Sequence, residues 1–266
     1  MSKMMITESV QAVDALILCG GLGSRLKSMF PDRPKGLASV AGRPVLDILV
    51  DDLLQQGFRR IILCVGHMKE QIIGYYEHRK DAQYIFSCEN EPLGTGGAVA
   101  QALPLVSGES MLIMNGDSFC RVDYSGLVQF HQARKALASI VLVTADERRD
   151  CGVIVMGEED RILSFSEKPS VQEPEGEFIN AGVYLLQKKA FDKVPWKVPF
   201  SLEQQLFPSL VDSRQCYGIF VAGTVTDIGT PERYLSANAA VVQSHCAMNI
   251  DAGADKATRF LRYCFD

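Results

Sequence analysis

The sequence predicts an α/β fold in which helices flank a mixed, mostly parallel sheet. In the first half of the 266-residue chain, short apolar runs alternate with longer amphipathic segments, the pattern of a parallel sheet covered on both faces. After about residue 150 the strand-like runs follow one another closely, which indicates a smaller antiparallel or mixed β portion. A hydrophobic content of 47% is sufficient for a substantial core in a chain of this length.

Each apolar run of the first half predicts a strand, and the segments between the runs predict helices. The segment 44–56 places its leucines on one helical face and is followed by Gly57, a helix stop signal. Strands are expected at 14–19, 59–65, 83–87, 110–115 and 139–145, and helical segments at 69–80, 96–103 and 125–137. The second half adds strands at 152–156, 161–166, 177–186 and about 215–222. Thr230 as N-cap and Pro231 at the first helical position then begin a helix of about a dozen residues.

Charge and cysteine usage exclude several classes of protein. The net charge is −5 with scattered basic residues, so no nucleic-acid-binding surface is expected. The eight cysteines include no C-x-x-C pair, which argues against a zinc site and for core thiols in a reducing compartment. A disulfide framework is the disfavoured alternative. No apolar run approaches about 18 residues and no signal pattern opens the chain, so we expect a cytoplasmic protein without a membrane partner.

A glycine-rich loop follows the first strand. Gly20-Gly21-Leu22-Gly23-Ser24-Arg25-Leu26 begins where the apolar run ends, and Pro34-Lys35 follows after a short loop. Backbone N–H groups near glycines can point at an anion, an arginine can hold phosphate oxygens bidentately, and a lysine supplies a mobile charge. The glycines alone are equally compatible with an ordinary turn. The two cations favour a phosphate-binding loop.

Polar residues also follow other strands, where ligands bind in open α/β sheets. The segment from Glu89 to Gly97 is rich enough in glycine for a flat base to approach the backbone. Asp117, in Asn115-Gly116-Asp117, is well placed for Mg²⁺, which takes one or two carboxylates when it is bound to phosphates. Asp227 has a similar setting, so the two aspartates can share a metal. Taken singly, each is better explained as a turn cap or a surface group.

Seven motifs together resemble the sugar-1-phosphate nucleotidyltransferase family over residues 14–240. In chain order they are Gly-Gly-Leu-Gly-Ser-Arg-Leu from residue 20, Pro-Lys from 34, Glu-Pro-Leu-Gly-Thr-Gly-Gly from 91, Asn-Gly-Asp from 115, Glu-Lys-Pro from 167, Asn-Ala-Gly-Val-Tyr from 180 and Asp-Ile-Gly-Thr-Pro-Glu-Arg-Tyr from 227. Within the family the chain is most similar to short guanylyltransferases acting on mannose 1-phosphate or D-glycero-α-D-manno-heptose 1-phosphate. The segment 200–203 contributes to that similarity.

The resemblance implies a Rossmann-like catalytic domain that transfers a nucleotidyl group from an NTP to a sugar 1-phosphate and releases pyrophosphate. It implies one domain over 1–242, with a nucleotide-binding part at about 14–150, a smaller sugar-phosphate-binding β portion at about 151–230, and a tail of unknown role at 243–266. The implied nucleotide-binding residues are Leu18, Gly20, Gly21, Gly23, Ser24, Arg25, Glu89, Gly94, Thr95 and Asn115. The implied catalytic residues are Arg25, Lys35 and Asp117. The implied sugar-phosphate ligands are Gly152, Glu167, Lys168 and Asn180, and Asp117 with Asp227 would hold Mg²⁺. A monomer or homodimer is expected.

Glu89 favours GTP among the nucleotides. It lies five residues before Gly94, where the uridylyl- and thymidylyltransferases of the family resemble one another in having glutamine. A carboxylate only accepts hydrogen bonds, which suits the adjacent N1–H and N2–H₂ groups of guanine and opposes the carbonyls of uracil.

Alternative interpretations remain at the level of the sequence. The chain can be a nucleotidyltransferase that uses UTP, CTP or dTTP, or a non-catalytic subunit of the same fold that senses a nucleotide sugar. Dinucleotide-dependent oxidation is disfavoured, because the loop lacks the G-x-G-x-x-G spacing and no acidic residue ends the second strand. The sugar itself is not identified by the sequence.

Overall fold

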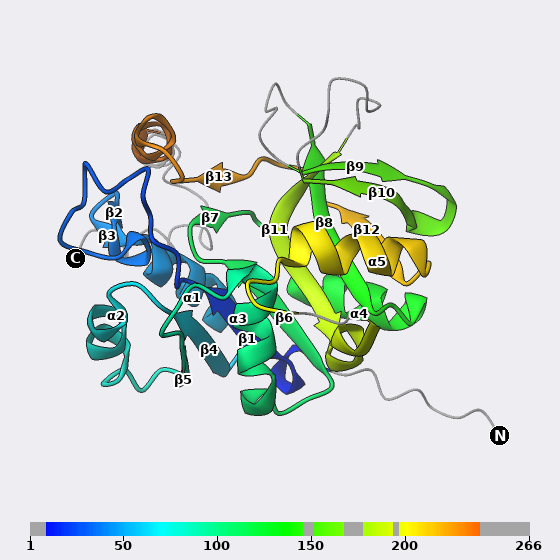
Figure 1. Cartoon of the computed structure of the whole chain (residues 1–266), viewed down its shortest axis with the longest axis horizontal. Helices are drawn as coiled ribbons and strands as arrows, with labels where there is room; N and C mark the ends of the chain where they lie inside the picture. Colours follow the sequence, from blue (N-terminus) through cyan, green and yellow to red (C-terminus); the bar gives the residue numbers. More distant parts are fainter. Residues whose placement is uncertain (1–8, 146–151, 168–177, 194–196, 240–266) are drawn as a thin grey trace, which may run out of the picture.

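The computed structural model describes residues 9–145, 152–167, 178–193 and 197–239, and its centre is a nine-stranded mixed sheet (Figure 1). Strands β6, β1, β4 and β5 form a parallel half, and β11 joins β6 antiparallel. The other half places β9 and β10 beyond β11, with β8 and β12 along its other edge. The strands are β1 (Asp14–Leu18), β4 (Arg60–Val65), β5 (Gln83–Cys88), β6 (Ser110–Asn115), β8 (Ala138–Thr144), β9 (Val153–Met156), β10 (Ile162–Ser166), β11 (Phe178–Gln187) and β12 (Cys216–Phe220).

Helices cover both faces of this sheet (Figure 1). Side chains along a strand point alternately to opposite faces, so Ala15 and Ile17 of β1 pack in one core cluster and Leu16 in the other. The first cluster contains residues of α1 (Val45–Gln55), α2 (Lys69–Tyr76) and α4 (Tyr124–Arg134). The second contains residues of α3 (Gly94–Ala102) and α5 (Phe207–Asp212). The α/β architecture expected from the sequence is therefore confirmed.

Most expected strands and helices are present with small changes at their ends. Helix α2 ends at Tyr76 rather than near residue 80, and α3 begins at Gly94, inside the segment expected to be a turn. The helix expected after Thr230 covers residues 231–239 of the described chain. Tyr234 on this helix donates a hydrogen bond to the Ser39 carbonyl at 2.5 Å and stacks edge-on against Phe30. The helix thus packs beside the glycine-rich loop.

The sequence did not predict several short elements. They are the hairpin β2 (Ser39–Val40) and β3 (Arg43–Pro44), the pair β7 (Ser118–Phe119) and β13 (Thr226–Asp227), the π-helical turn η6 (Leu202–Leu206) with α5, and the 3₁₀ turns η1 (Val10–Ala12), η2 (Lys35–Leu37), η3 (Leu103–Leu105), η4 (Glu158–Asp160) and η5 (Lys188–Lys193). Elements this short carry no periodic pattern to detect. Among them, β7, β13, η2 and η6 hold residues of the candidate site.

The cysteines of the described ranges are all free, and four of the five are buried. This agrees with the expectation of core thiols; Cys151, Cys246 and Cys264 lie outside the described residues, as does the tail 243–266. No helix within the described ranges is long and apolar enough to cross a bilayer.

Candidate active site

The site lies at the carboxyl ends of the parallel strands, as the topology of an open α/β sheet requires. Backbone hydrogen bonds tie the strand ends together. Gly116 N–H donates to the Leu18 carbonyl at 2.9 Å and His67 N–H donates to the Gly20 carbonyl at 3.1 Å. A Cβ on Gly116 would lie 2.8 Å from the Leu18 oxygen, and one on Gly66 would lie 2.7 Å from the Gly20 oxygen. Glycine is therefore needed where the loops after β4 and β6 touch the chain leaving β1.

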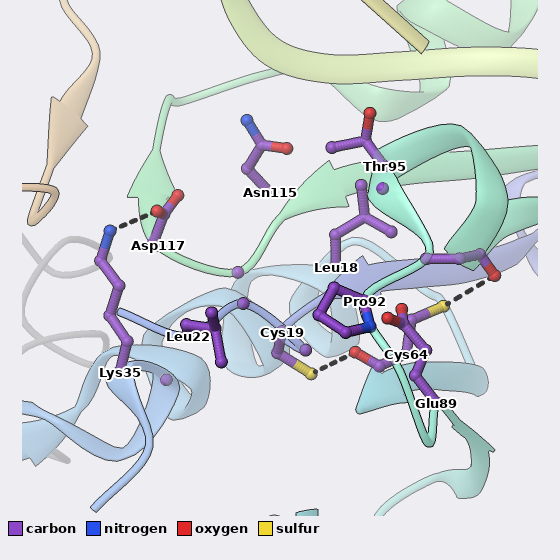
Figure 2. A pocket seen from close by; sticks show the side chains of 16 residues that line it. Leu18, Cys19, Leu22, Lys35, Cys64, Glu89, Pro92, Thr95, Asn115 and Asp117 are labelled. Atoms are coloured by element: carbon purple, nitrogen blue, oxygen red, sulfur yellow. Dashed lines mark hydrogen bonds and ion pairs between the residues drawn. The ribbon is translucent and has the colours of Figure 1, made fainter. Parts of the chain in front are cut away.

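A cavity of about 370 Å³ opens at these strand ends (Figure 2). It receives residues from the loops or ends of β1, β5 and β6, from η2 and from the start of α3. The residues expected from the sequence that line this first pocket are Leu18, Gly20, Gly21, Lys35, Glu89, Gly94, Thr95, Asn115 and Asp117; Cys19, Cys64 and Pro92 also line it. Segments separated by some 100 residues in the chain thus meet around one cavity.

Glu89 lies at one end of the first pocket in Figure 2, opposite Lys35 and Asp117. One of its carboxylate oxygens accepts a hydrogen bond from the Leu93 backbone N–H at 3.2 Å. Burial raises the pKa of Glu89 above its ordinary value, and the hydrogen bond from Leu93 offsets part of that rise. The half-buried Glu89 side chain lines the first pocket and also a neighbouring cleft beside His67.

Lys35 and Asp117 form an ion pair across the other end of the pocket (Figure 2). Lys35 comes from η2 and its side chain is only 15% exposed, whereas that of Asp117 is 40% exposed. Asp117 follows β6 and precedes β7 directly. A cation is therefore held at the mouth of the pocket by a more exposed carboxylate.

A second pocket of about 160 Å³ adjoins the first, and Asn115 and Asp117 line both. Its other walls come from the second half of the chain and from the glycine-rich loop. The expected residues that line it are Arg25, Gly152, Glu167, Asn180 and Asp227. The expected site is thus arranged as two compartments that meet at the end of β6.

Gly182 makes the junction of the two pockets possible. Its φ of +73° lies in the left-handed region, and a Cβ there would lie 2.7 Å from Asn115 Nδ2. The register of β11 shifts between Asn180 and Tyr184 against β8, a bulge of the kind that re-aims side chains near functional sites. The glycine in Asn-Ala-Gly therefore leaves room for the asparagine after β6.

The pairing of β13 with β7 brings the two aspartates to one place. Asp227 is opposite Ser118 in this ladder, and Ile228 N–H donates to the Asp117 carbonyl at 3.0 Å. The Asp227 carboxylate also accepts a hydrogen bond from Gly229 N–H at 2.8 Å and lies 3.4 Å from the Arg233 guanidinium. No group of three or more His, Cys, Asp or Glu side chains in the described ranges is arranged to hold a metal, so any cation here would rest on these two carboxylates.

Some expected residues lie elsewhere. Arg25, expected at the triphosphate, lines the second pocket rather than the first, and Gly23 lines a smaller cleft beside Lys35. Ser24 is exposed and lines neither pocket. Lys168 lies outside the described residues. These four assignments stay predictions of the sequence.

The segment around Phe200 packs closely against Gly96 and Gly97. A Cβ on Gly96 would overlap the Phe200 ring, and Gly97 N–H donates to the Phe200 carbonyl at 3.0 Å. At Gly96 and Gly97, the space inferred for a flat base is therefore occupied by the segment around Phe200.

The sequence did not single out two further residues of the site. Arg233 contacts Asp227, and Glu203 contacts Thr95. In the sequence, Arg233 was detectable only as part of the motif from residue 227, and Glu203 only as part of the segment 200–203.

Comparison with known proteins agrees with this architecture. A family model described as nucleotidyl transferase matches residues 14–244. The mannose-1-phosphate guanylyltransferase of Mycobacterium tuberculosis (strain ATCC 25618 / H37Rv) is 30% identical over 87% of this chain and 65% of its own length. The catalytic subunit beta of mannose-1-phosphate guanylyltransferase from Drosophila melanogaster is 34% identical over 84% of this chain and 61% of its own length. The chain thus spans somewhat over half the length of these curated relatives.

Solved structures give the same result. HddC from Yersinia pseudotuberculosis, complexed with GMP-PN, is 31% identical with a TM-score of 0.73 and covers 86% of this chain and 99% of its own. A UDP-glucose pyrophosphorylase complexed with UDP-glucose is 16% identical with a TM-score of 0.76, over 87% of this chain and 99% of its own, and shares the fold. With the family model matching most of its length, the chain belongs to the nucleotidyl transferase family.

Proposed function

We propose that this chain transfers GMP from GTP to a sugar 1-phosphate of the mannose or heptose type, giving a GDP-sugar and pyrophosphate. The observation that carries the proposal is the pair of pockets that share Asn115 and Asp117, with the Lys35 ammonium at their junction. A nucleotide in the first pocket and a sugar phosphate in the second would meet there. The guanylyltransferase names of the relatives support the reaction class.

The residues suit a reaction between two anions. The phosphate of the sugar 1-phosphate is already a nucleophile, so no general base is needed, and the main difficulty is bringing two polyanions together. Lys35 at the junction and Arg25 in the second pocket supply positive charge for this purpose. We therefore propose a direct in-line attack on the α-phosphorus without a covalent intermediate, in which no cysteine takes part.

Asp117 and Asp227 fit a Mg²⁺ ion. Both carboxylates line the second pocket, and Mg²⁺ bound to phosphates takes only one or two protein carboxylates. When bound, the ion would offset negative charge on the phosphates. Asp117 is the present partner of Lys35, so a cation on this carboxylate would free the ammonium to pair with a phosphate oxygen.

A matrix of substrates tests the function. GTP, UTP, CTP and dTTP are each combined with mannose, glucose, N-acetylglucosamine and heptose 1-phosphates, with and without Mg²⁺, and pyrophosphate release is measured. We expect the highest kcat/KM with GTP and mannose or heptose 1-phosphate, and only with Mg²⁺. Tight nucleotide-sugar binding without pyrophosphate release in any combination would favour a sensing subunit instead.

Glu89→Gln is expected to reduce the preference for GTP over UTP about tenfold or more. The glutamine amide has one acceptor oxygen in place of two, so it cannot accept from both guanine donors as the carboxylate does. The ratio of the two kcat/KM values measures this. Glu91→Gln is the matched control, since Glu91 is exposed on the same loop and does not line the first pocket. An unchanged ratio in Glu89→Gln would remove the basis for GTP selection.

The same carboxylate predicts a pH dependence. Its pKa is raised by burial, so Glu89 takes up a proton at a higher pH than an exposed glutamate does. Guanine N–H groups bind the ionised form, and the KM for GTP should rise as the pH falls through this raised value. A pH profile of the KM for GTP in the wild type and in Glu89→Gln checks this, since only the wild type should show the rise.

Arg25→Ala is expected to lower kcat/KM by about 100-fold without loss of the fold, because an exposed guanidinium that contacts a phosphate contributes to binding and not to packing. Steady-state kinetics and thermal unfolding check the two halves of this statement. Arg33→Ala is the control, since this exposed arginine lines neither of the two pockets and only the smaller cleft beside Lys35. Full activity of Arg25→Ala would mean that the glycine-rich loop has been misinterpreted.

A further inference from the structure

A buried glutamate lies between the two pockets. Glu203 in η6 is only 8% exposed, and burying a carboxylate is costly unless hydrogen bonds satisfy it. One of its oxygens accepts hydrogen bonds from Thr95 Oγ1 at 2.6 Å and Ser201 Oγ at 2.8 Å. The other accepts from the Tyr184 hydroxyl at 3.4 Å, the longest of the three contacts. Thr95 lines the first pocket, so the Glu203 carboxylate contacts a residue in the wall of that pocket.

The chain of hydrogen bonds continues into the second pocket. Asn180 Nδ2 donates to the Tyr184 hydroxyl at 2.7 Å, and Asn180 Oδ1 accepts from Gly182 N–H at 2.8 Å. Tyr184 is fully buried in β11, with its ring against Phe207. Asn180 lines the second pocket. A continuous buried path therefore runs from a wall of one pocket to a wall of the other.

The carboxylate sets the direction of the hydrogen bonds that the Thr95 and Tyr184 hydroxyls make in this path. An ionised carboxylate only accepts, so both Thr95 and Tyr184 must use their single hydroxyl proton toward Glu203. Burial, and then the Glu203 carboxylate, raise the pKa of Tyr184 well above its ordinary value, so the hydroxyl keeps the proton that it donates. Glu203 gives this buried hydroxyl an acceptor, which a buried polar group requires.

These hydrogen bonds decide whether Thr95 and Asn180 offer a donor or an acceptor to a ligand in the pocket that each of them lines. Thr95 Oγ1 accepts from Leu202 N–H at 3.0 Å, and with its proton already used it presents only an acceptor to a ligand. The Tyr184 oxygen can then only accept from Asn180, and the Gly182 N–H can only donate to it, so the two partners together orient the asparagine amide with nitrogen toward Tyr184 and oxygen toward Gly182. Among the described residues, Tyr184 is the acceptor recorded for this amide nitrogen, so its second N–H can serve a ligand in the second pocket.

We propose that Glu203 is a positioning residue that fixes the hydrogen-bond direction of Thr95 in the nucleotide pocket and, through Tyr184, of Asn180 in the sugar-phosphate pocket. This rests on the proposed function for the identity of the two ligands. A nucleotide hydroxyl that donates would match Thr95, and a sugar or phosphate oxygen that accepts would match the Asn180 amide. Glu203 itself touches neither ligand.

Kinetics of Glu203→Gln and Tyr184→Phe test the path. The glutamine oxygen should stay with the two strong donors Thr95 and Ser201, so its new N–H₂ group faces Tyr184 and conflicts with the Asn180 amide. Both variants should raise the KM for the sugar 1-phosphate about tenfold, equivalent to about 1.4 kcal/mol, with the KM for GTP changed less than twofold. The double variant should be no worse than the poorer single one, because the two residues act on Asn180 through the same path.

Tyr124→Phe is the matched control. Tyr124 is also fully buried and lines neither pocket, so loss of its hydroxyl should leave both KM values unchanged. If the wild type and this control release pyrophosphate while Glu203→Gln and Tyr184→Phe keep the wild-type KM for the sugar 1-phosphate, the positioning role is wrong and the proposed function stands. Equal changes in both KM values would indicate a merely structural role and would also overturn it.

A second readout does not depend on turnover. With ¹⁵N-asparagine labelling, the side-chain amide resonance of Asn180 is identified by its loss in Asn180→Asp. We expect that resonance to shift in Glu203→Gln and in Tyr184→Phe but not in Tyr124→Phe. An unmoved Asn180 resonance in both path variants would contradict the inference even if no substrate pair proved active.

Discussion

Lys35→Ala is expected to lower kcat/KM for GDP-sugar formation by about 10²–10³-fold, the cost of removing one well-placed charge from a phosphoryl-transfer site. Lys35 is a cation at the junction of both pockets, and its side chain is 15% exposed. Its ion pair with Asp117 is partly solvated, and such pairs contribute about 0–1 kcal/mol to stability. The fold should therefore survive the substitution, and steady-state kinetics with thermal unfolding measure both effects.

Lys27→Ala is the matched control for this result. Lys27 directly follows the glycine-rich loop, is exposed, and lines neither of the two pockets. It should retain activity within about twofold, since an exposed charge outside both pockets is largely screened by solvent and salt. If Lys35→Ala and Lys27→Ala have equal activity, Lys35 does not act at the reacting phosphates.

Asp117→Asn is expected to lower kcat by at least about 100-fold and to raise the Mg²⁺ concentration needed for half-maximal rate. An amide carries no charge, so it holds a hard cation less well and no longer pairs with the Lys35 ammonium. The measurement is the rate of pyrophosphate release as a function of Mg²⁺ concentration. Because Asp117 is 40% exposed, the free energy of unfolding should change by about 1 kcal/mol or less.

Asp160→Asn controls for loss of an exposed acidic partner. Asp160 pairs with Arg134 at 2.5 Å and is 47% exposed, but it lines neither pocket. Its substitution should change neither the rate nor the Mg²⁺ requirement. If Asp117→Asn keeps the wild-type Mg²⁺ dependence, the two-carboxylate cation site at Asp117 and Asp227 is incorrect.

The sequence predicted best what depends on patterns along the chain. The strands β1, β4 and β6 are nearly continuous apolar runs and β5 contains a shorter one, and the carboxyl ends of these four strands must lie at one edge of a parallel sheet. The pattern along the chain therefore predicts that Glu89, Asn115 and the loop after Leu18 lie close together, and all of them line one cavity. In a parallel sheet, residues that directly follow neighbouring strands lie close together in space, even when they are far apart in the sequence.

The sequence was less informative where tertiary contacts decide. Nothing local in Ser118 or Thr226 indicates that β7 pairs with β13, although this ladder brings Asp227 beside Asp117. Arg25 lines the second pocket. Its position depends on the turns of the glycine-rich loop, and the sequence pattern does not predict the geometry of those turns. The burial of Glu203 depends on partners about 108 and 19 residues away along the chain, and no short motif records such contacts.

The most direct test of the central claim is the initial rate of pyrophosphate release from GTP and Mg²⁺ in the presence and absence of a sugar 1-phosphate. If the two pockets bring a nucleotide and a sugar phosphate together at Asn115 and Asp117, release must depend wholly on mannose or heptose 1-phosphate and yield an equal amount of GDP-sugar. Release at the same rate without any sugar phosphate, or release that leaves GMP attached to the protein, would contradict the two-pocket mechanism.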